Sequence, residues 1–198
     1  MKKCIFPAIG LLLILIFPAC QPKSGNKINA EVYSKFQQAG DKISNTTQGV
    51  LLANVGKAMQ NGGPKNAVSF CNLKASPIVD SLSNVNNCLI SRVSAKNRNP
   101  VNALQDKTDE QVWDFFANHI PGTFPRDTLI ALKGEIIYYK PIKIGIPTCL
   151  KCHGIPGQDI DNETYTKLQK LYPNDLATDY HLNDFRGLWK IRFSIAKK

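Results

Sequence analysis

A first pattern of apolar residues runs from residue 30 to residue 60. Its members recur at near-helical spacing and are Val32, Phe36, Ala39, Ile43, Val50, Ala53 and Met59. This spacing predicts one or two long helices. Any interruption is expected near Gly40 or Gly49, because glycine is the weakest helix former after proline.

A second helix is expected directly after this run. The segment Asn61-Gly62-Gly63-Pro64 ends the first pattern, and its proline suits the first turn of a new helix over about residues 65–83. Within that helix Cys71 falls on the same face as Ala67 and Phe70. We therefore expect the Cys71 thiol on the buried side.

Strand-like and helix-like segments alternate in the rest of the chain. Apolar and polar side chains alternate in residues 88–95, as in a strand, and Lys133-Gly134-Glu135 is a hairpin signal between strands at 129–132 and 136–144. Further helices are expected at 109–118 and 162–171, and a last strand at 188–195. This order predicts an α+β domain, in which an antiparallel sheet has N-terminal helices and flanking helices.

The first nineteen residues have the pattern of a lipoprotein-type signal peptide. Lys2 and Lys3 give a positive start, residues 5–19 are almost wholly apolar, and Cys20 follows directly. The apolar run is shorter than the roughly 20 residues that a membrane-spanning helix needs. We expect export to the periplasmic side and a lipid on Cys20. Because Phe17-Pro18 departs from the usual cleavage box, ordinary cleavage nearby is the alternative.

Three segments follow from this pattern: a signal peptide (1–19), a polar tether (20–29) and one domain (30–198). Removal of Lys2 and Lys3 reduces the formal net charge from +10 to +8. We expect no nucleic-acid partner, since basic residues are scattered and the chain is exported. The charge favours a membrane surface or an acidic redox or signalling partner outside the cytoplasm, although a solvated surface is its commonest meaning.

The most specific chemical signal is Cys149-Leu150-Lys151-Cys152-His153. Two cysteines separated by two residues and followed by histidine form the attachment signature for a c-type haem. The two thiols can reach the vinyl groups of one porphyrin edge, and His153 then becomes the proximal ligand of the iron. A CxxC redox disulfide and half of a zinc site are the alternatives. Export agrees with haem, because bacteria complete c-type attachment outside the cytoplasmic membrane.

Two cysteines have no assigned role after this step. Cys4 leaves with the signal and Cys20 takes the lipid, so Cys71 and Cys88 are left over. In an exported protein such a pair defaults to a disulfide. Our hypothesis is instead that Cys88 is a buried strand residue.

Four segments resemble the PAS-like c-type haem-binding domain family, long catalogued as a domain of unknown function. They are Ala67 to Asn72 with Ala75 and Pro77; Arg98-Asn99-Pro100 with Asn102; Cys149 to Gly154; and Tyr172 to Tyr180 followed by Asp184-Phe185-Arg186-Gly187. Together they span about residues 30–195. Asp179 and Asn183 stand where the family often has glycine, and both residue types tolerate turn geometry.

The resemblance implies a PAS-like sheet with helices on one side and one covalent haem c per chain. It also implies an axial pair of histidine and cysteine, which here would be His153 and Cys71. Taken from the residues alone, Cys71 is as well explained by inert packing or by a disulfide with Cys88. Met59, His119 and His181 are weaker candidates for the distal ligand.

Arg98 and Arg186 are candidate partners of the haem propionates, because guanidinium binds carboxylates in a bidentate manner. The equally weighted alternative is that Arg98 stabilises its own loop and Arg186 its own turn.

The expected function is a redox or small-ligand sensor in which His153 and Cys71 both bind the haem iron. The alternative is a membrane-tethered, single-haem electron carrier of a respiratory chain. We expect no enzyme, since the sequence shows no acid–base pair, activated nucleophile or phosphate loop, and a peroxidase would need an open iron site.

Overall fold

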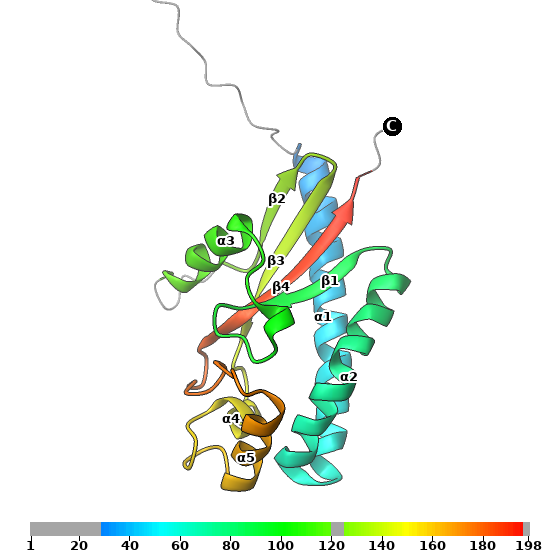
Figure 1. Cartoon of the computed structure of the whole chain (residues 1–198). Coiled ribbons are helices and arrows are strands. Elements are labelled where there is room, and N and C mark those ends of the chain that lie inside the picture. Colours follow the sequence, from blue (N-terminus) through cyan, green and yellow to red (C-terminus); the bar gives the residue numbers. More distant parts are fainter. Residues whose placement is uncertain (1–28, 120–124, 196–198) are drawn as a thin grey trace, which may run out of the picture.

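A four-stranded antiparallel sheet forms the centre of the structure, a computed structural model that describes residues 29–119 and 125–195 (Figure 1). The strand order is β1-β4-β3-β2. The strands are β1 (Leu89–Val93), β2 (Thr128–Leu132), β3 (Glu135–Lys143) and β4 (Phe185–Ser194). The predicted signal peptide, most of the tether and Cys20 lie outside the described residues.

Two long helices cover one face of the sheet. Helix α1 spans Ala30–Gln60 without a break, so the interruptions considered near Gly40 and Gly49 do not occur. Helix α2 spans Gly63–Val85, with a proline in its first turn as expected. Apolar side chains of both helices pack on Ile136, Tyr138, Trp189, Ile191 and Phe193 of the sheet.

The helices occupy both faces of the sheet, which corrects the expectation of helices on one side. Helix α3 spans Lys107–Ala117, and its Val112 and Phe116 pack on the opposite face. Successive strand residues point to opposite faces, so Tyr138 lies beneath α1 whereas Tyr139 lies beneath α3. The α+β class is confirmed, and two layers of helices enclose the sheet.

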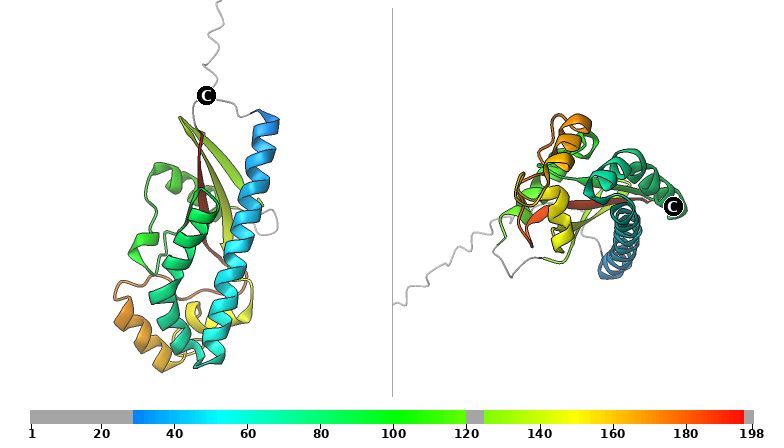
Figure 2. Two further views of the ribbon diagram at one scale, coloured as in Figure 1. Left: turned by 90° about the vertical axis from the view of Figure 1, so that its right-hand side faces the viewer. Right: turned by 90° about the horizontal axis from the view of Figure 1, so that it is seen from below.

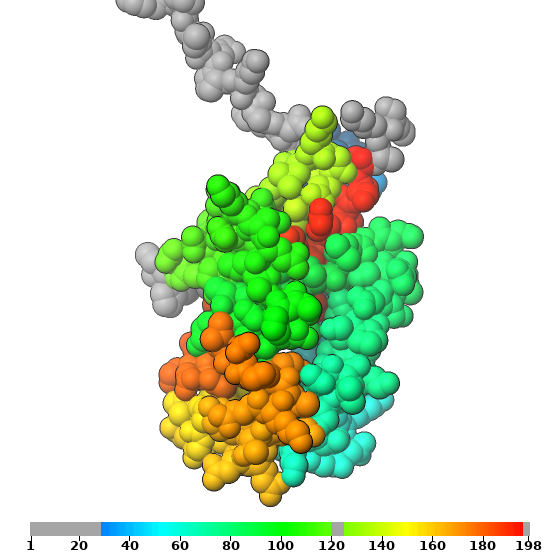
Figure 3. All heavy atoms as spheres, viewed as in Figure 1, coloured from blue at the N-terminus to red at the C-terminus, as the bar shows by residue number. Residues whose placement is uncertain are grey.

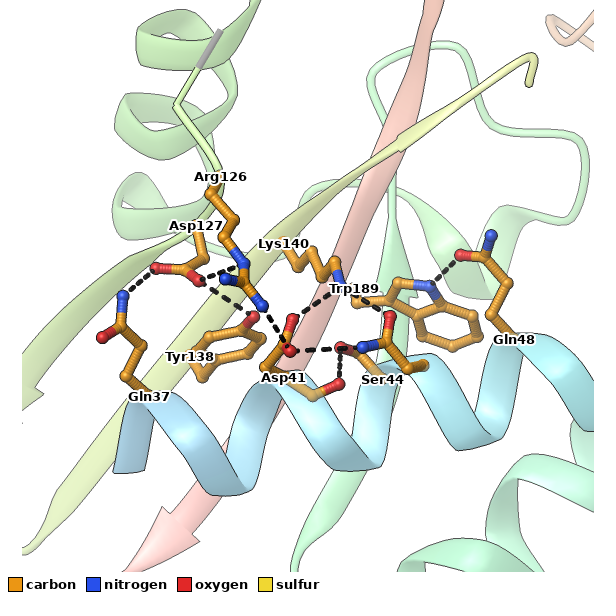
Figure 4. Close-up of polar contacts among 10 residues, drawn as sticks. Gln37, Asp41, Ser44, Gln48, Arg126, Asp127, Tyr138, Lys140 and Trp189 are labelled. Atoms are coloured by element: carbon orange, nitrogen blue, oxygen red, sulfur yellow. Dashed lines mark hydrogen bonds and ion pairs between the residues drawn. The ribbon is translucent and has the colours of Figure 1, made fainter. Parts of the chain in front are cut away.

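A row of polar contacts joins α1 to the sheet (Figure 4). Asp41 accepts hydrogen bonds from Lys140 Nζ and from Arg126 Nη2, each at 2.7 Å. Further along α1, Gln48 Oε1 accepts a hydrogen bond of 3.0 Å from the indole of Trp189. These contacts fix how α1 lies across the strands.

Two short helices and the loops around them close one end of the sheet. Helix α4 spans Pro147–His153 and follows β3, while α5 spans Asn162–Leu171 as expected. Leu168 of α5 packs with Val68 of α2, so these two helices lie side by side on the molecular surface (Figure 3). Together with α4 and the last turns of α1, these two helices surround a cavity.

The first turns of α1 and the end of β4 lie at the other end of the molecule (Figure 2). The rings of Phe36 and Phe193 are 5.1 Å apart there. Across residues 29–119 and 125–195, no helix has the length and apolar character needed to cross a membrane.

Candidate functional site

The Cys-x-x-Cys-His motif forms a helix of its own, α4. Pro147 stands in its first turn, where a missing N–H is tolerated, and Gly154 N–H donates to Leu150 O (2.8 Å) where the helix ends. A side chain at Gly154 would collide with Asp159, since its Cβ would lie 2.6 Å from Asp159 Oδ2. The glycine after the motif therefore permits a tight turn that brings residues 155–160 back over α4.

One cavity of about 360 Å³ gathers the residues that the sequence singled out. Its wall includes Cys71, Arg98, Cys149, Cys152, His153 and Arg186. Apolar side chains of α1 and α2 form much of the rest, and its volume lies in the range of small-molecule and cofactor sites. Half-exposed Leu52 and Ile146 also line it, so the cavity reaches the surface beside them.

His153 is held by the backbone of a distant loop. Its Nδ1 lies 2.8 Å from Ala177 O, which accepts a hydrogen bond when Nδ1 carries the proton. In that tautomer Nε2 keeps the lone pair that a metal ligand needs. Burial, with the nearby guanidiniums of Arg98 and Arg186, lowers the pKa of His153 well below its usual value. The neutral imidazole is therefore the favoured form.

Arg98 fastens the end of α4 to the loop that follows α5. Its Nε donates to Asp175 Oδ2 (2.8 Å), and its Nη2 donates to Cys152 O (2.6 Å) and Ala177 O (3.1 Å). In the same loop, Asp179 N–H and Tyr180 N–H donate to Gly154 O and His153 O. Three of the four segments used for the family resemblance therefore meet at one structural point.

Arg186 is the second residue of β4 and lies over the ring of Tyr180, with its Cζ 5.4 Å from the ring centroid. Its Nη1 donates to Ser94 Oγ and Lys96 O, both at 3.0 Å. Its Nε is buried and has no hydrogen bond with a described residue. Contact of either arginine with a haem carboxylate stays a prediction.

Sequence reasoning missed a third arginine of the cavity wall, Arg92 on β1. The alternation of β1 puts Arg92 on the same face as buried Ile90, where a charge is unexpected. Burial lowers the pKa of Arg92. A charged residue on the apolar face of a strand is the signal that could have identified it.

The two spare cysteines lie at opposite ends of α2. Cys71 is near its start and lines the cavity, whereas Cys88 follows its C-terminus and packs against the core. Fourteen helical residues separate Cys71 from the end of α2, a rise of about 21 Å. A disulfide needs Cα atoms within about 7 Å, so these two cysteines cannot pair in this fold. Both are free thiols. Cys88 is only partly buried and stands one residue before β1 begins, which corrects the expectation that it is a buried strand residue.

The structure bears on one alternative to haem at the motif, half of a zinc site. In the part of the chain that the structure describes, no three His, Cys, Asp or Glu side chains are grouped closely enough to hold a metal ion. Burial raises the pKa of the Cys152 thiol to about 11. Thiols spread around one cavity fit a larger group better than a single zinc ion.

The three weaker candidates for the distal iron ligand differ in whether they line the cavity. Met59, at the end of α1, lines the cavity, although its sequence setting favoured it little. His119 follows α3, with its Nδ1 2.6 Å from Phe115 O, and His181 is largely exposed beside Asp184. Neither histidine lines the cavity.

Comparison with known proteins agrees with this geometry. No curated protein matches the chain. The crystal structure of the cyanobacterial heme-protein Tll0287 is similar, with a TM-score of 0.59, 20% sequence identity, and coverage of 86% of this chain and 99% of that chain. At this identity the likeness shows a shared fold. The model of the Tll0287-like family matches residues 26–194, so this chain belongs to the Tll0287-like family.

Proposed function

We propose that this chain is an exported, lipid-anchored c-type haem protein that senses redox state or a small ligand through an iron bound by His153 and Cys71. One observation carries the proposal: a single cavity is lined by both thiols of the attachment motif, the adjacent imidazole and a further thiol from α2. The similar structure is that of a heme protein, which supports the assignment.

The residues of the cavity fit a haem. Cys149 and Cys152 would attach it covalently, and His153 would offer Nε2 to the iron when its Nδ1 donates to Ala177 O. The buried Nε of Arg186 lacks a partner, and a carboxylate would supply one. When bound, a haem supplies an iron that changes oxidation state and exchanges an axial ligand.

The two proposed axial ligands are held very differently, and this favours a sensor. His153 is tied to Ala177 and lies beside a thiol proposed to be covalently attached. The thiol of Cys71, carried on α2, has no hydrogen bond with a described residue. Of the two, Cys71 would be the ligand more readily displaced on reduction or on binding of NO or CO. Its release would remove one constraint on α2, which stays packed on the sheet and on α5 and is joined to α1 where Asn66 Nδ2 donates to Ala58 O (2.9 Å).

Production with a c-type maturation system tests haem attachment and ligation together. We expect one covalent haem per chain by mass, and a low-spin ferric electron paramagnetic resonance signal with the narrow g-spread of thiolate ligation. Cys71→Ser should abolish that signal. Cys88→Ser and Met59→Leu, the matched controls, should keep it. A wild-type protein without haem, or a thiolate signal that survives Cys71→Ser, refutes the assignment.

Reduction then separates a sensor from an electron carrier. A sensor changes its absorption spectrum to that of a new ligand set, or binds CO, on reduction. A carrier keeps both ligands in both oxidation states and binds no CO. Retention of both ligands would replace the sensor by the electron carrier expected as the alternative from sequence.

Membrane attachment is a separate part of the proposal and rests on the sequence of residues 1–20. Wild-type protein should incorporate a radiolabelled fatty acid and sediment with membranes. Cys20→Ala should lose the label. Equal labelling of both proteins would refute lipid attachment at Cys20.

A further inference from the structure

The cavity wall is rich in cations and has no acid. Three arginines line it, Arg92, Arg98 and Arg186, and no Asp or Glu among the described residues does so. Asp175 lies just outside the lining and pairs with Arg98 alone. Taking a charge out of water costs free energy unless a counter-ion or hydrogen bonds compensate it. The arrangement therefore calls for an anion inside the cavity.

The three arginines differ in how many of their N–H donors already have a hydrogen-bond acceptor. Arg98 is engaged by one carboxylate and two backbone carbonyls. Arg186 uses Nη1 on Ser94 and Lys96, and its buried Nε is unpartnered. The guanidinium of Arg92 has neither a hydrogen bond nor an ion pair with a described residue, and it lies over the Trp189 ring, with Cζ 5.9 Å from the ring centroid.

The placement of Arg92 is fixed by the sheet. It lies directly opposite Trp189 in the β1–β4 register, and both residues line the cavity. Gln48 of α1 accepts a hydrogen bond from the Trp189 indole and holds this ring in place (Figure 4). Arg92 is thus a cation on a rigid support with free donors, which is the condition for binding a carboxylate in a bidentate manner.

We propose that Arg92 and Arg186 bind the two propionate carboxylates of the haem, and that Arg98 is a positioning residue for α4. This inference rests on the proposed function. It reassigns one of the two arginines that the sequence suggested, because Arg98 already has its partners. It also adds Arg92, which no motif indicated.

The test uses the haem-loaded protein and reads the carboxylates directly. Arg92→Gln should lower the frequency of the propionate bending band in the resonance Raman spectrum, because a weaker hydrogen bond softens that bend. Removal of a cation should also favour ferric iron, by about tenfold in the ratio of ferric to ferrous protein, or about 59 mV for a one-electron couple. Arg92→Lys keeps the charge and should restore most of the potential.

Three further variants make the outcome specific. Arg186→Gln should also move the propionate band. Arg98→Gln should leave the band in place and disturb histidine ligation instead. Arg126→Gln, at a largely exposed arginine paired with Asp41, should change neither readout.

Different experimental results would refute this inference and the proposed function. A wild-type chain that takes up no haem refutes the proposed function. A haem-loaded wild type whose band and potential are unchanged by Arg92→Gln refutes only the role of Arg92. A changed thiolate signal with an unchanged propionate band would show that Arg92 faces the Cys71 sulfur, and would also overturn the inference.

Discussion

Nδ1 of His153 lies 2.8 Å from the carbonyl oxygen of Ala177, a residue that follows it by 24 positions. The imidazole is therefore oriented by a backbone group, which no side-chain replacement removes. The loop that supplies this carbonyl is itself held by Arg98. The orientation of His153 thus depends on three separate segments of the chain.

We predict that imidazole rescues a chain that lacks the His153 ring. His153→Ala should keep the covalent haem, since both attachment thiols remain, but lose the low-spin absorption spectrum. Added imidazole should restore it by filling the vacated space. The exposed His181→Ala is the matched control and should behave as wild type. A wild-type spectrum in His153→Ala would exclude His153 as the iron ligand.

Alanine in place of glycine should change the free energy of unfolding in opposite directions at two positions of α1. Alanine in place of an exposed helical glycine stabilises by about 0.5–1 kcal/mol, and Gly49 should show this gain, because a Cβ added there would meet open space. A Cβ at Gly40 would run into the ring of Tyr138, so Gly40→Ala should cost about 1–3 kcal/mol. Urea unfolding of both variants measures the difference, and a gain at Gly40 would contradict this packing of α1.

Asp41 should make part of the stability depend on pH. Lys140 and Arg126 lower its pKa, so it contributes stability above the unfolded carboxyl pKa of about 3.9 and loses it as pH falls through the folded value. Asp41→Asn should cost roughly 1 kcal/mol at pH 7, and the difference should vanish in acid. Unfolding curves at several pH values test this. Asp80→Asn, at an exposed position on α2, should show no comparable loss.

Two non-glycine residues that the sequence analysis singled out, Asp179 and Asn183, adopt left-handed backbone conformations. Asp179 has φ 61° and Asn183 has φ 73°. Asn183→Gly should be neutral or stabilise by less than about 1 kcal/mol, whereas Asn183→Val should cost about 1–2 kcal/mol, since a β-branched side chain resists this conformation. Thermal unfolding distinguishes these variants, and equal stability of glycine and valine would contradict the turn geometry.

Helices and hairpins that have clear local sequence signals, such as a capping residue or a turn glycine, were predicted correctly. Helix α5 matches its prediction at both ends, because Asp161 caps it and its apolar residues keep helical spacing. The hairpin of β2 and β3 turns at Gly134, where φ is 86°. Helix α4 was not predicted as a helix, since seven residues rich in Cys, Thr and His carry little helical preference.

The part of the candidate site that lies within short sequence motifs could be predicted. The attachment residues and His153 form one motif, and family resemblance added Cys71. Their meeting in one cavity depends on contacts between remote segments, such as Arg98 with Cys152, which are 54 positions apart. Spacing along the chain carries no information about such pairs. Arg92 belongs to no motif, and only its place on the apolar face of β1 marks it.

Helix α1 also fixes a distance. Thirty-one helical residues extend about 46 Å, from the end near the tether to the end that forms the cavity wall. In a chain anchored through Cys20, this rod would act as a spacer that holds the cofactor away from the bilayer surface.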